Sequence, residues 1–168
     1  MTEARIRELA PEDWPRVRAI YEEGLATGYS TLETVAPEWP AWDAGHVAAP
    51  RLVATLDGVV AGWAALSPVS ARAAYQGVAE VSVYVAADAR GRGLGRALLE
   101  ALIAASEAAG FWTLQAVILA ENGASIELHQ RVGFRLVGRR ERLGVRHGVW
   151  RDSVLLERRS RVVAWPGT

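Results

Sequence analysis

The sequence of 168 residues lacks cysteine, net charge and any long apolar run. Without cysteine there can be no disulfide, no thiolate nucleophile and no zinc site with thiolate ligands. The 19 basic and 19 acidic residues balance, so no overall field draws the chain to nucleic acid or to an anionic membrane. No apolar run reaches the ~20 residues of a membrane helix, and the first residues lack the apolar core of a signal peptide. We therefore expect no nucleic-acid partner, no membrane partner and a cytoplasmic location.

The length and composition are those of one globular domain. Apolar residues make up 51% of the chain and charged residues 23%, which is the balance of a protein that folds around a core. The chain is long enough to bury that core without disulfides or metals. It contains neither a low-complexity tract nor a solenoid-like repeat. We expect a single domain over residues 1–168, with a core at about 3–157 and a tail at 158–168.

Local patterns predict strands and helices along the chain. Asp57-Gly58 between two β-rich runs is typical of a hairpin turn, and Gly110 is suited to end a long helix rich in alanine and leucine. The predicted strands are 5–9, 51–56, 59–67, 78–85, 113–119, 134–143 and 149–156. The predicted helices are 11–24, 39–46, 94–109 and 122–132. This order predicts an α/β (α+β) fold in which helices flank one mixed sheet.

A glycine-rich turn from Arg90 to Arg96 joins the strand 78–85 to the helix that starts at Leu94. Glycines permit backbone conformations closed to other residues, so successive N–H groups can point at phosphate oxygens, and the helix dipole adds to the attraction. The turn is not a dinucleotide-binding G-x-G-x-x-G, because Arg96 takes the place of the last glycine, and no P-loop Gly-Lys-Ser/Thr follows. A plain connector is the alternative, but the flanking strand and helix favour an anion site.

Two blocks resemble a known family. Arg90, Gly93 and Gly95 give Arg-x-x-Gly-x-Gly, and residues 122–134 are similar to Asn-x-x-Ala-x-x-Leu-Tyr-x-x-x-Gly-Phe. Together they resemble the GNAT superfamily of N-acetyltransferases, whose members hold the pyrophosphate of acetyl-CoA in this turn. The resemblance implies acetyl-CoA as co-substrate, no metal, and the GNAT fold: a mixed, mostly antiparallel sheet of six to seven strands with about four helices and a splayed cofactor cleft. The cofactor-binding residues that it implies are Val83, Tyr84, Val85, Arg90, Gly91, Arg92, Gly93, Leu94, Gly95, Arg96, Asn122 and Ser125.

Further residues narrow the resemblance to the phosphinothricin acetyltransferase-like branch. His129 stands where most of the superfamily has a tyrosine that protonates the departing CoA thiolate. Members of this branch acetylate phosphinothricin, methionine sulfoximine, methionine sulfone or related small molecules, and they commonly form homodimers. Thr31-Leu32-Glu33 and Val78-Ala79 depart from the branch pattern, so the exact acceptor stays open. The other positions that match the branch are Arg72, Tyr75, Glu80, His147, Trp150 and Asp152.

Glu80 and His129 are the catalytic residues that the resemblance implies. Glu80 lies in an apolar strand, where a buried carboxylate without partners is costly, so it faces water or a polar cavity. We interpret Glu80 as a general base, acting directly or through water, with a solvent-facing strand position as the alternative. His129 shares a helical stripe with Leu128 and Val132, so a core histidine is the alternative to a base, an acid or a positioning group. The residues expected to contact the acceptor are Thr31, Arg72, Tyr75 and Ser82.

The expected reaction is direct attack of an amine on the thioester in a ternary complex, without an acyl-enzyme. The resemblance implies that the strand segment Val83 to Val85 splays from its neighbour and pairs with the pantetheine arm. A main-chain N–H near Val83 would then polarise the thioester carbonyl. The expected acceptor is the amino group of a small amino-acid-like molecule. Protein N-termini or polyamines as acceptors, or a non-catalytic acyl-CoA sensor on the same fold, are the alternatives.

Overall fold

The computed structural model describes residues 3–167, and its strands form one mixed sheet in the order β1-β2-β3-β4-β5-β7-β6. Every pair of neighbours is antiparallel except β4 and β5. The strands are β1 (Ala4–Glu8), β2 (Arg51–Leu56), β3 (Val59–Pro68), β4 (Val78–Val85), β5 (Thr113–Leu119), β6 (Arg135–Arg146) and β7 (Val149–Arg159). The helices are α1 (Trp14–Thr27), α2 (Trp39–Gly45), α3 (Leu94–Ala108) and α4 (Gly123–Arg131), with 3-10 turns η1 (Pro11–Asp13), η2 (Ala73–Tyr75) and η3 (Ala87–Ala89). The predicted fold class is confirmed.

Helices cover both faces of the sheet. Trp63 of β3 lies against Tyr21 of α1, with ring centroids 6.1 Å apart. Because side chains alternate along a strand, Gly62 faces the other way. A Cβ added to Gly62 would come within 2.9 Å of Leu98 in α3. Helices α1 and α3 therefore pack on opposite faces of β3, and the sheet between them forms the centre of the core.

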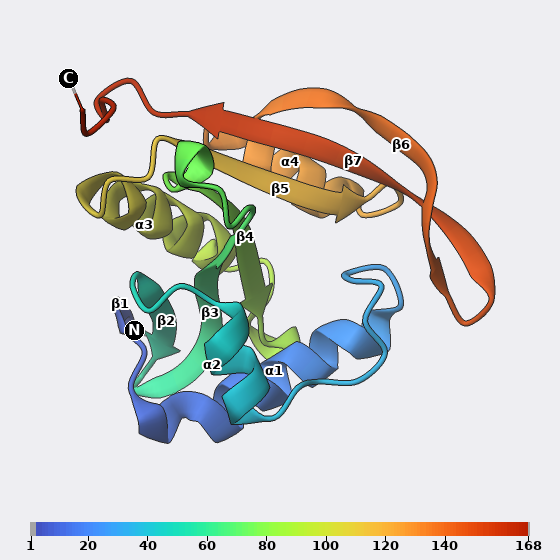
Figure 1. Cartoon of the computed structure of the whole chain (residues 1–168). Coiled ribbons are helices and arrows are strands. Elements are labelled where there is room, and N and C mark those ends of the chain that lie inside the picture. Colours follow the sequence, from blue (N-terminus) through green and yellow to red (C-terminus); the bar gives the residue numbers. More distant parts are fainter. Residues whose placement is uncertain (1–2, 168) are drawn as a thin grey trace.

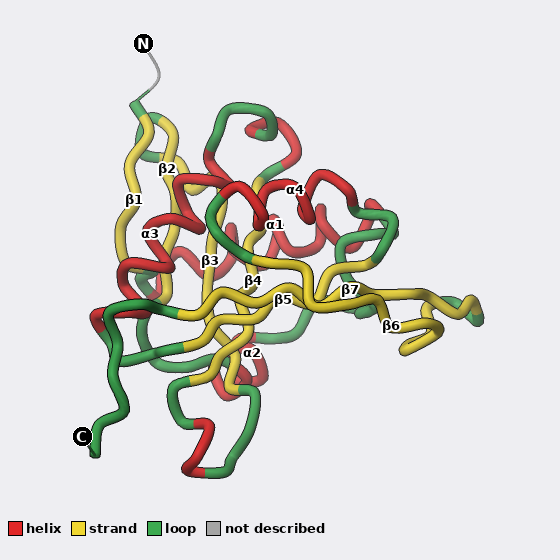
Figure 2. Tube along the Cα trace, turned by 90° about the horizontal axis from the view of Figure 1, so that it is seen from above, coloured by secondary structure: helices red, strands yellow, loops and turns green. Residues whose placement is uncertain are grey.

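The sheet divides in the middle. The parallel ladder of β4 and β5 has only three pairs, which run from Val78↔Thr113 to Glu80↔Gln115. Beyond Glu80, β4 stays paired with β3 as far as Val85↔Gly62, while β5 stays paired with β7 as far as Leu119↔Ser153. Each strand thus keeps its outer partner and loses its inner one. Figures 1 and 2 show β4 and β5 running apart, as the expected splayed cleft requires.

The hairpin of β6 and β7 curves back toward the end of α1 (Figure 1). Arg146 donates from Nη2 to the carbonyl oxygen of Leu25 at 2.8 Å, and Arg151 donates from Nη2 to that of Gly28 at 3.2 Å. Positive charge is favourable at the carboxyl end of a helix. Strand β6 runs past the predicted end at residue 143, because a register shift between Arg140 and Gly144 bends it without ending the pairing. The hairpin therefore bridges the two halves of the sheet.

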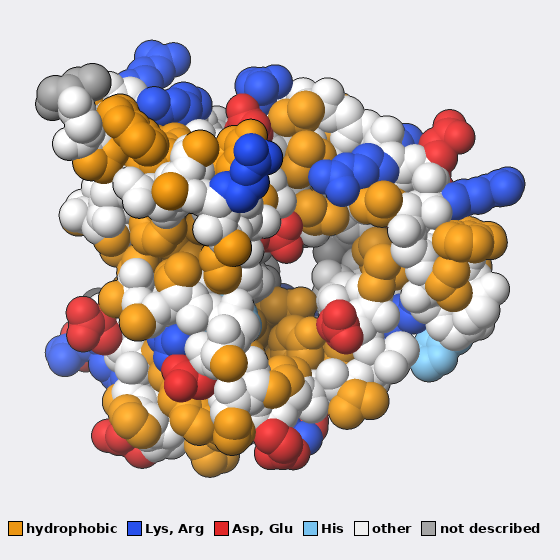
Figure 3. All heavy atoms as spheres, viewed as in Figure 1, with side chains coloured by type: hydrophobic (Ala, Val, Ile, Leu, Met, Phe, Trp, Pro, Cys, Tyr) orange, Lys and Arg blue, Asp and Glu red, His pale blue; other side chains and the backbone are white. Residues whose placement is uncertain are grey.

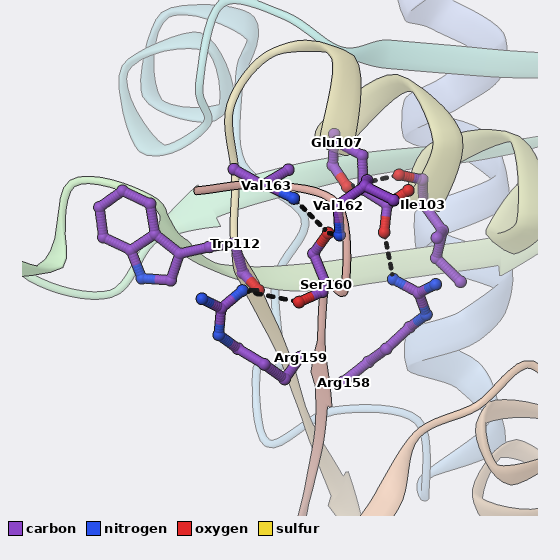
Figure 4. Close-up of polar contacts among 9 residues, drawn as sticks. Ile103, Glu107, Trp112, Arg158, Arg159, Ser160, Val162 and Val163 are labelled. Carbon is purple, nitrogen blue, oxygen red and sulfur yellow. Dashed lines mark hydrogen bonds and ion pairs between the residues drawn. The ribbon is translucent and has the colours of Figure 1, made fainter. Parts of the chain in front are cut away.

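The carboxyl end of the described chain packs beside α3. Strand β7 continues to Arg159, farther than the strand predicted at 149–156. Arg158 donates to Glu107 of α3 at 2.9 Å, and the N–H of Ser160 donates to the Trp112 carbonyl at 2.7 Å (Figure 4). Arginine is the cation in every ion pair found between described residues. These contacts hold residues 158–160 against the α3–β5 junction.

Gly77 directly precedes β4, and a substitution there tests how tightly β4 packs against Trp112. Its carbonyl accepts N–H groups from Trp112 at 2.8 Å and Thr113 at 3.1 Å, and the Trp112 ring occupies the space where a Cβ would stand. We predict that Gly77→Ala lowers the free energy of unfolding by about 1–3 kcal/mol, because the indole or the backbone must move. Urea denaturation measures this change. Gly45→Ala in α2, where a Cβ meets nothing within 4 Å, is the control; equal losses in both variants would contradict the packing argument.

Candidate functional site

A cavity of about 650 Å³ fills the space between the separating strands. Figure 3 shows an opening through this face of the molecule, between the part around β4 and the β6–β7 hairpin. The predicted site residues that line the cavity are Thr31, Glu80, Ser82, Val83, Tyr84, Val85, Arg90, Gly95, Asn122, Ser125 and His129. The predicted site residues outside its lining are Arg72, Tyr75, Gly91, Arg92, Gly93, Leu94 and Arg96. The splay thus brings both predicted catalytic residues to one cavity.

The glycine-rich turn adopts a backbone conformation that requires its glycines. Gly91 and Gly93 have φ values of 75° and 80°, in the left-handed region that favours glycine. The first bond of α3 is donated by Ala97 to the Gly93 carbonyl at 3.0 Å, so the N–H groups of residues 94–96 precede the helical ladder. Leu94 is 3% exposed and packs into the core, which leaves only its N–H for a ligand. The turn therefore presents main-chain donors at the positive end of a helix.

The three arginines of this turn differ in their surroundings. Arg90 lines the cavity and donates from Nε to the Val85 carbonyl at 3.3 Å. Arg96 donates to Glu100 at 2.8 Å, one helical turn away, and both side chains are exposed. Arg92 is exposed. Arg90 is consequently the arginine of the turn that is best placed to meet a ligand in the cavity.

Glu80 occupies the branch point of the sheet. Its side chain is half-buried and lines the cavity, and its Oε1 accepts a hydrogen bond from Nε2 of Gln115 at 2.9 Å. Ser67 is its cross-strand partner on β3. Glu80 therefore faces a polar pocket, which agrees with one of the two environments that the sequence allowed.

His129 is both buried and part of the cavity wall. It is 5% exposed, and its Nδ1 lies 2.7 Å from the carbonyl oxygen of Ser125, one turn earlier in α4. Burial lowers the pKa of His129 by disfavouring the charged ring. The neutral ring must then donate from Nδ1 to the carbonyl, so Nε2 keeps its lone pair. This state can accept a proton, whereas it must first be protonated to act as an acid.

Asn122 caps α4 at a position that favours asparagine. Its Oδ1 accepts the N–H of Ser125 at 3.3 Å. The cap fixes the first turn of α4 and therefore the position of the His129 ring one turn later. Since Asn122 and Ser125 also line the cavity, a structural role and a binding role coexist in both residues.

Of the aromatic wall on the α1–α2 side of the cavity, only Tyr84 was a site residue predicted from the sequence. Trp63 stacks on Tyr84 at 4.9 Å, and Tyr21 meets Tyr84 edge-on at 5.0 Å. Trp42 meets Trp63 at 5.6 Å and stacks on His46 at 4.1 Å. Burial raises the pKa of Tyr84, so its hydroxyl stays protonated at neutral pH. The alternation of side chains along β3, which directs Trp63 toward the core, was the one sequence pattern that could have indicated this wall.

Other predicted residues lie away from the cavity. Arg72 stacks over the Tyr75 ring at 5.8 Å on the exposed loop before β4. Their contact with the acceptor stays a prediction. Trp150 is 60% exposed near the hairpin turn. Asp152 accepts the N–H of Arg142 at 2.9 Å and the guanidinium of Arg139 at 2.7 Å, and these two donors lower its pKa. Asp152 thereby stabilises the bend in β6.

Within residues 3–167, no group of three or more His, Asp or Glu side chains is arranged to hold a metal ion. Within the same range, no helix is both long and apolar enough to cross a membrane.

Comparisons with known proteins agree with this geometry. Residues 5–134 match the model of the Acetyltransferase (GNAT) family. Phosphinothricin N-acetyltransferase of Alcaligenes faecalis is 36% identical over 91% of the chain and 81% of the relative. The L-methionine sulfoximine/L-methionine sulfone acetyltransferase of Pseudomonas paraeruginosa is 35% identical over 92% of the chain and 93% of the relative. A phosphinothricin acetyltransferase from Sinorhizobium meliloti, solved in complex with acetyl-CoA, superposes with a TM-score of 0.84. It is 31% identical, and the superposition covers 98% of the chain and 97% of the relative. The chain belongs to the GNAT family of acetyltransferases.

Proposed function

We propose that this N-acetyltransferase moves the acetyl group of acetyl-CoA to the amino group of a small amino-acid-like molecule, such as phosphinothricin, methionine sulfoximine or methionine sulfone. The observation that carries the proposal is the single cavity that joins the glycine-rich turn to Glu80 and His129. The two curated relatives act on such molecules by name, and each aligns with more than nine-tenths of the chain. The solved relative from Sinorhizobium meliloti contains acetyl-CoA.

The chain offers complementary groups for each part of acetyl-CoA. The pyrophosphate would lie on the N–H groups of the turn, with Arg90 beside it. The pantetheine arm would pair with the inner edge of Val83 to Val85, where β4 has lost its neighbour β5. Bound acetyl-CoA supplies an activated acetyl group as a thioester. An N–H near Val83 would stabilise the oxyanion that forms on the thioester carbonyl.

The acceptor would approach from the α1–α2 side, where the aromatic wall lies. Glu80 takes a proton from the ammonium group, directly or through water, and the free amine attacks the thioester carbon. The C–N bond forms, the C–S bond breaks, and the thiolate leaves. His129, with its Nε2 lone pair, can receive the amine proton and return it to the sulfur. An α-amino group of pKa ~8 gives up its proton at neutral pH for only ~1 kcal/mol, so one such base suffices.

We also propose that residues 1–168 form one domain, that the protein works in the cytoplasm without nucleic-acid or membrane partners, and that it forms a homodimer. The formal net charge of zero supports the absence of polyanionic partners. At the hairpin end Val145 and Trp150 are cross-strand partners, and they are 46% and 60% exposed. Exposed apolar groups that lie together are typical of a surface that another chain covers.

Release of free CoA thiol tests the proposed reaction. With acetyl-CoA present, we expect methionine sulfoximine, methionine sulfone or phosphinothricin to release thiol well above the rate without an amine. We expect polyamines and peptide N-termini to release much less, because an aromatic wall borders the α1–α2 side of the cavity, from which the acceptor would approach. No release with any amine of the panel would favour a sensor that binds acyl-CoA without turnover.

Glu80→Gln tests the base. We expect kcat to fall by about 10²–10⁴-fold, since the amide cannot accept the proton, while calorimetry gives an unchanged affinity for acetyl-CoA. Glu100→Gln on the exposed side of α3 serves as the control and keeps full turnover. Unchanged kcat in Glu80→Gln would remove Glu80 from the mechanism.

Gly93→Val tests the anion site. The left-handed φ of 80° disfavours valine, so the turn must change its backbone conformation and the Kd for acetyl-CoA should rise at least about tenfold. Gly110→Val is a matched control, because Gly110 has a φ of 89° at the other end of α3 and a Cβ there also meets nothing within 4 Å. Equal affinities in the two variants would count against the placement of the pyrophosphate.

A further inference from the structure

We infer that Gln115 is a positioning residue for the reaction, which holds the Glu80 carboxylate so that one oxygen stays free for the acceptor amine. The inference rests on the proposed role of Glu80. Gln115 is not part of the cavity lining, so it can act only through a residue that is. The 2.9 Å hydrogen bond from its Nε2 to Oε1 of Glu80 provides that connection.

The register of the sheet explains why Glu80 needs a partner here. Glu80↔Gln115 is the last pair of the parallel ladder, and directly paired residues project to the same face. After this pair β5 turns away, so β4 keeps β3 on one side but has no strand on the other side to restrict the side chains that follow. A glutamate at the end of a ladder would rotate freely among its rotamers. The bond from Gln115 selects one of them.

The chemistry of the contact fixes the direction of the hydrogen bond. An ionised carboxylate can only accept hydrogen bonds, so the amide nitrogen of Gln115 must face it. Oε1 of Glu80 is then occupied, and Oε2 remains to take the proton. Among the side chains of residues 3–167, Gln115 donates the hydrogen bond to Glu80. A neutral amide orients the carboxylate without competing for the proton that is transferred.

The surroundings of Gln115 favour this role over a general structural one. On β7 its cross-strand neighbour is Glu157, which is engaged with Arg135 at 3.0 Å. Gln115 therefore has one carboxylate on each side, and the one facing the cavity is the one it binds. Loss of the amide would leave the backbone ladder intact, because the Gln115 main chain stays paired with both β4 and β7.

Turnover of Gln115→Met tests the inference. Methionine keeps the length of the side chain and removes the donor, so we expect kcat to fall by about tenfold, as for loss of a hydrogen bond to a charged group. The KM for acetyl-CoA and the melting temperature should stay the same. Gln115→Glu is the second variant; it places like charge against Glu80, and we expect a larger loss of kcat. Thr113→Val, two residues earlier on the same face, is the control and should match the parent.

A double-mutant cycle separates positioning from a structural role. If Gln115 acts through Glu80, then Glu80→Gln combined with Gln115→Met should turn over at the rate of Glu80→Gln alone. Losses that multiply in the double variant would overturn the inference. Full turnover in both Gln115 variants, with Glu80→Gln inactive, would also overturn it and leave the proposed function standing. Full turnover in Glu80→Gln would instead refute the proposed base.

Discussion

The separation of β4 from β5 after one short parallel ladder is the constraint on which the rest of this structure depends. Main-chain groups buried away from water must find partners, and sheets normally provide them. Here each strand satisfies its outer edge, β4 with β3 and β5 with β7, and the two inner edges are left facing a cavity. Such an edge accepts an extended ligand as a missing strand. The sheet therefore creates the site by what it leaves unpaired.

This division also sets where each functional group lies. The turn at the start of α3 is at the open end of the cleft, and Glu80 is at its apex beside Gln115. The aromatic wall of α1, α2 and β3 covers one side, and His129 of α4 contributes to the other. The β6–β7 hairpin ties the halves together through Arg146 and Arg151 at the end of α1. The width of the cleft is thus set by contacts remote from the glycine-rich turn.

Local signals predicted much of this arrangement, and long-range pairing decided the remainder. The turn and the strand around Glu80 each depend on neighbours in sequence, so residue type and spacing were enough. Gln115 meets Glu80 only because of the register between β4 and β5, which no local pattern encodes. Trp42 and His46 reach the cavity because α2 packs on β3. The longer β6 depends on a bulge, whose extra residues break the alternation that marks a strand.

The choice of arginine for the ion pairs has a chemical consequence. All 19 basic residues of the printed sequence are arginines, including those that tie the hairpin to α1 and β7 to α3. A lysine ε-amine is a nucleophile that an activated acetyl donor can modify, with loss of its charge. Guanidinium groups keep their protons at any physiological pH and are poor nucleophiles. A protein that works beside a reactive acyl donor in this way offers no lysine amine that the donor could acylate, so the charges of its ion pairs are not lost to that reaction.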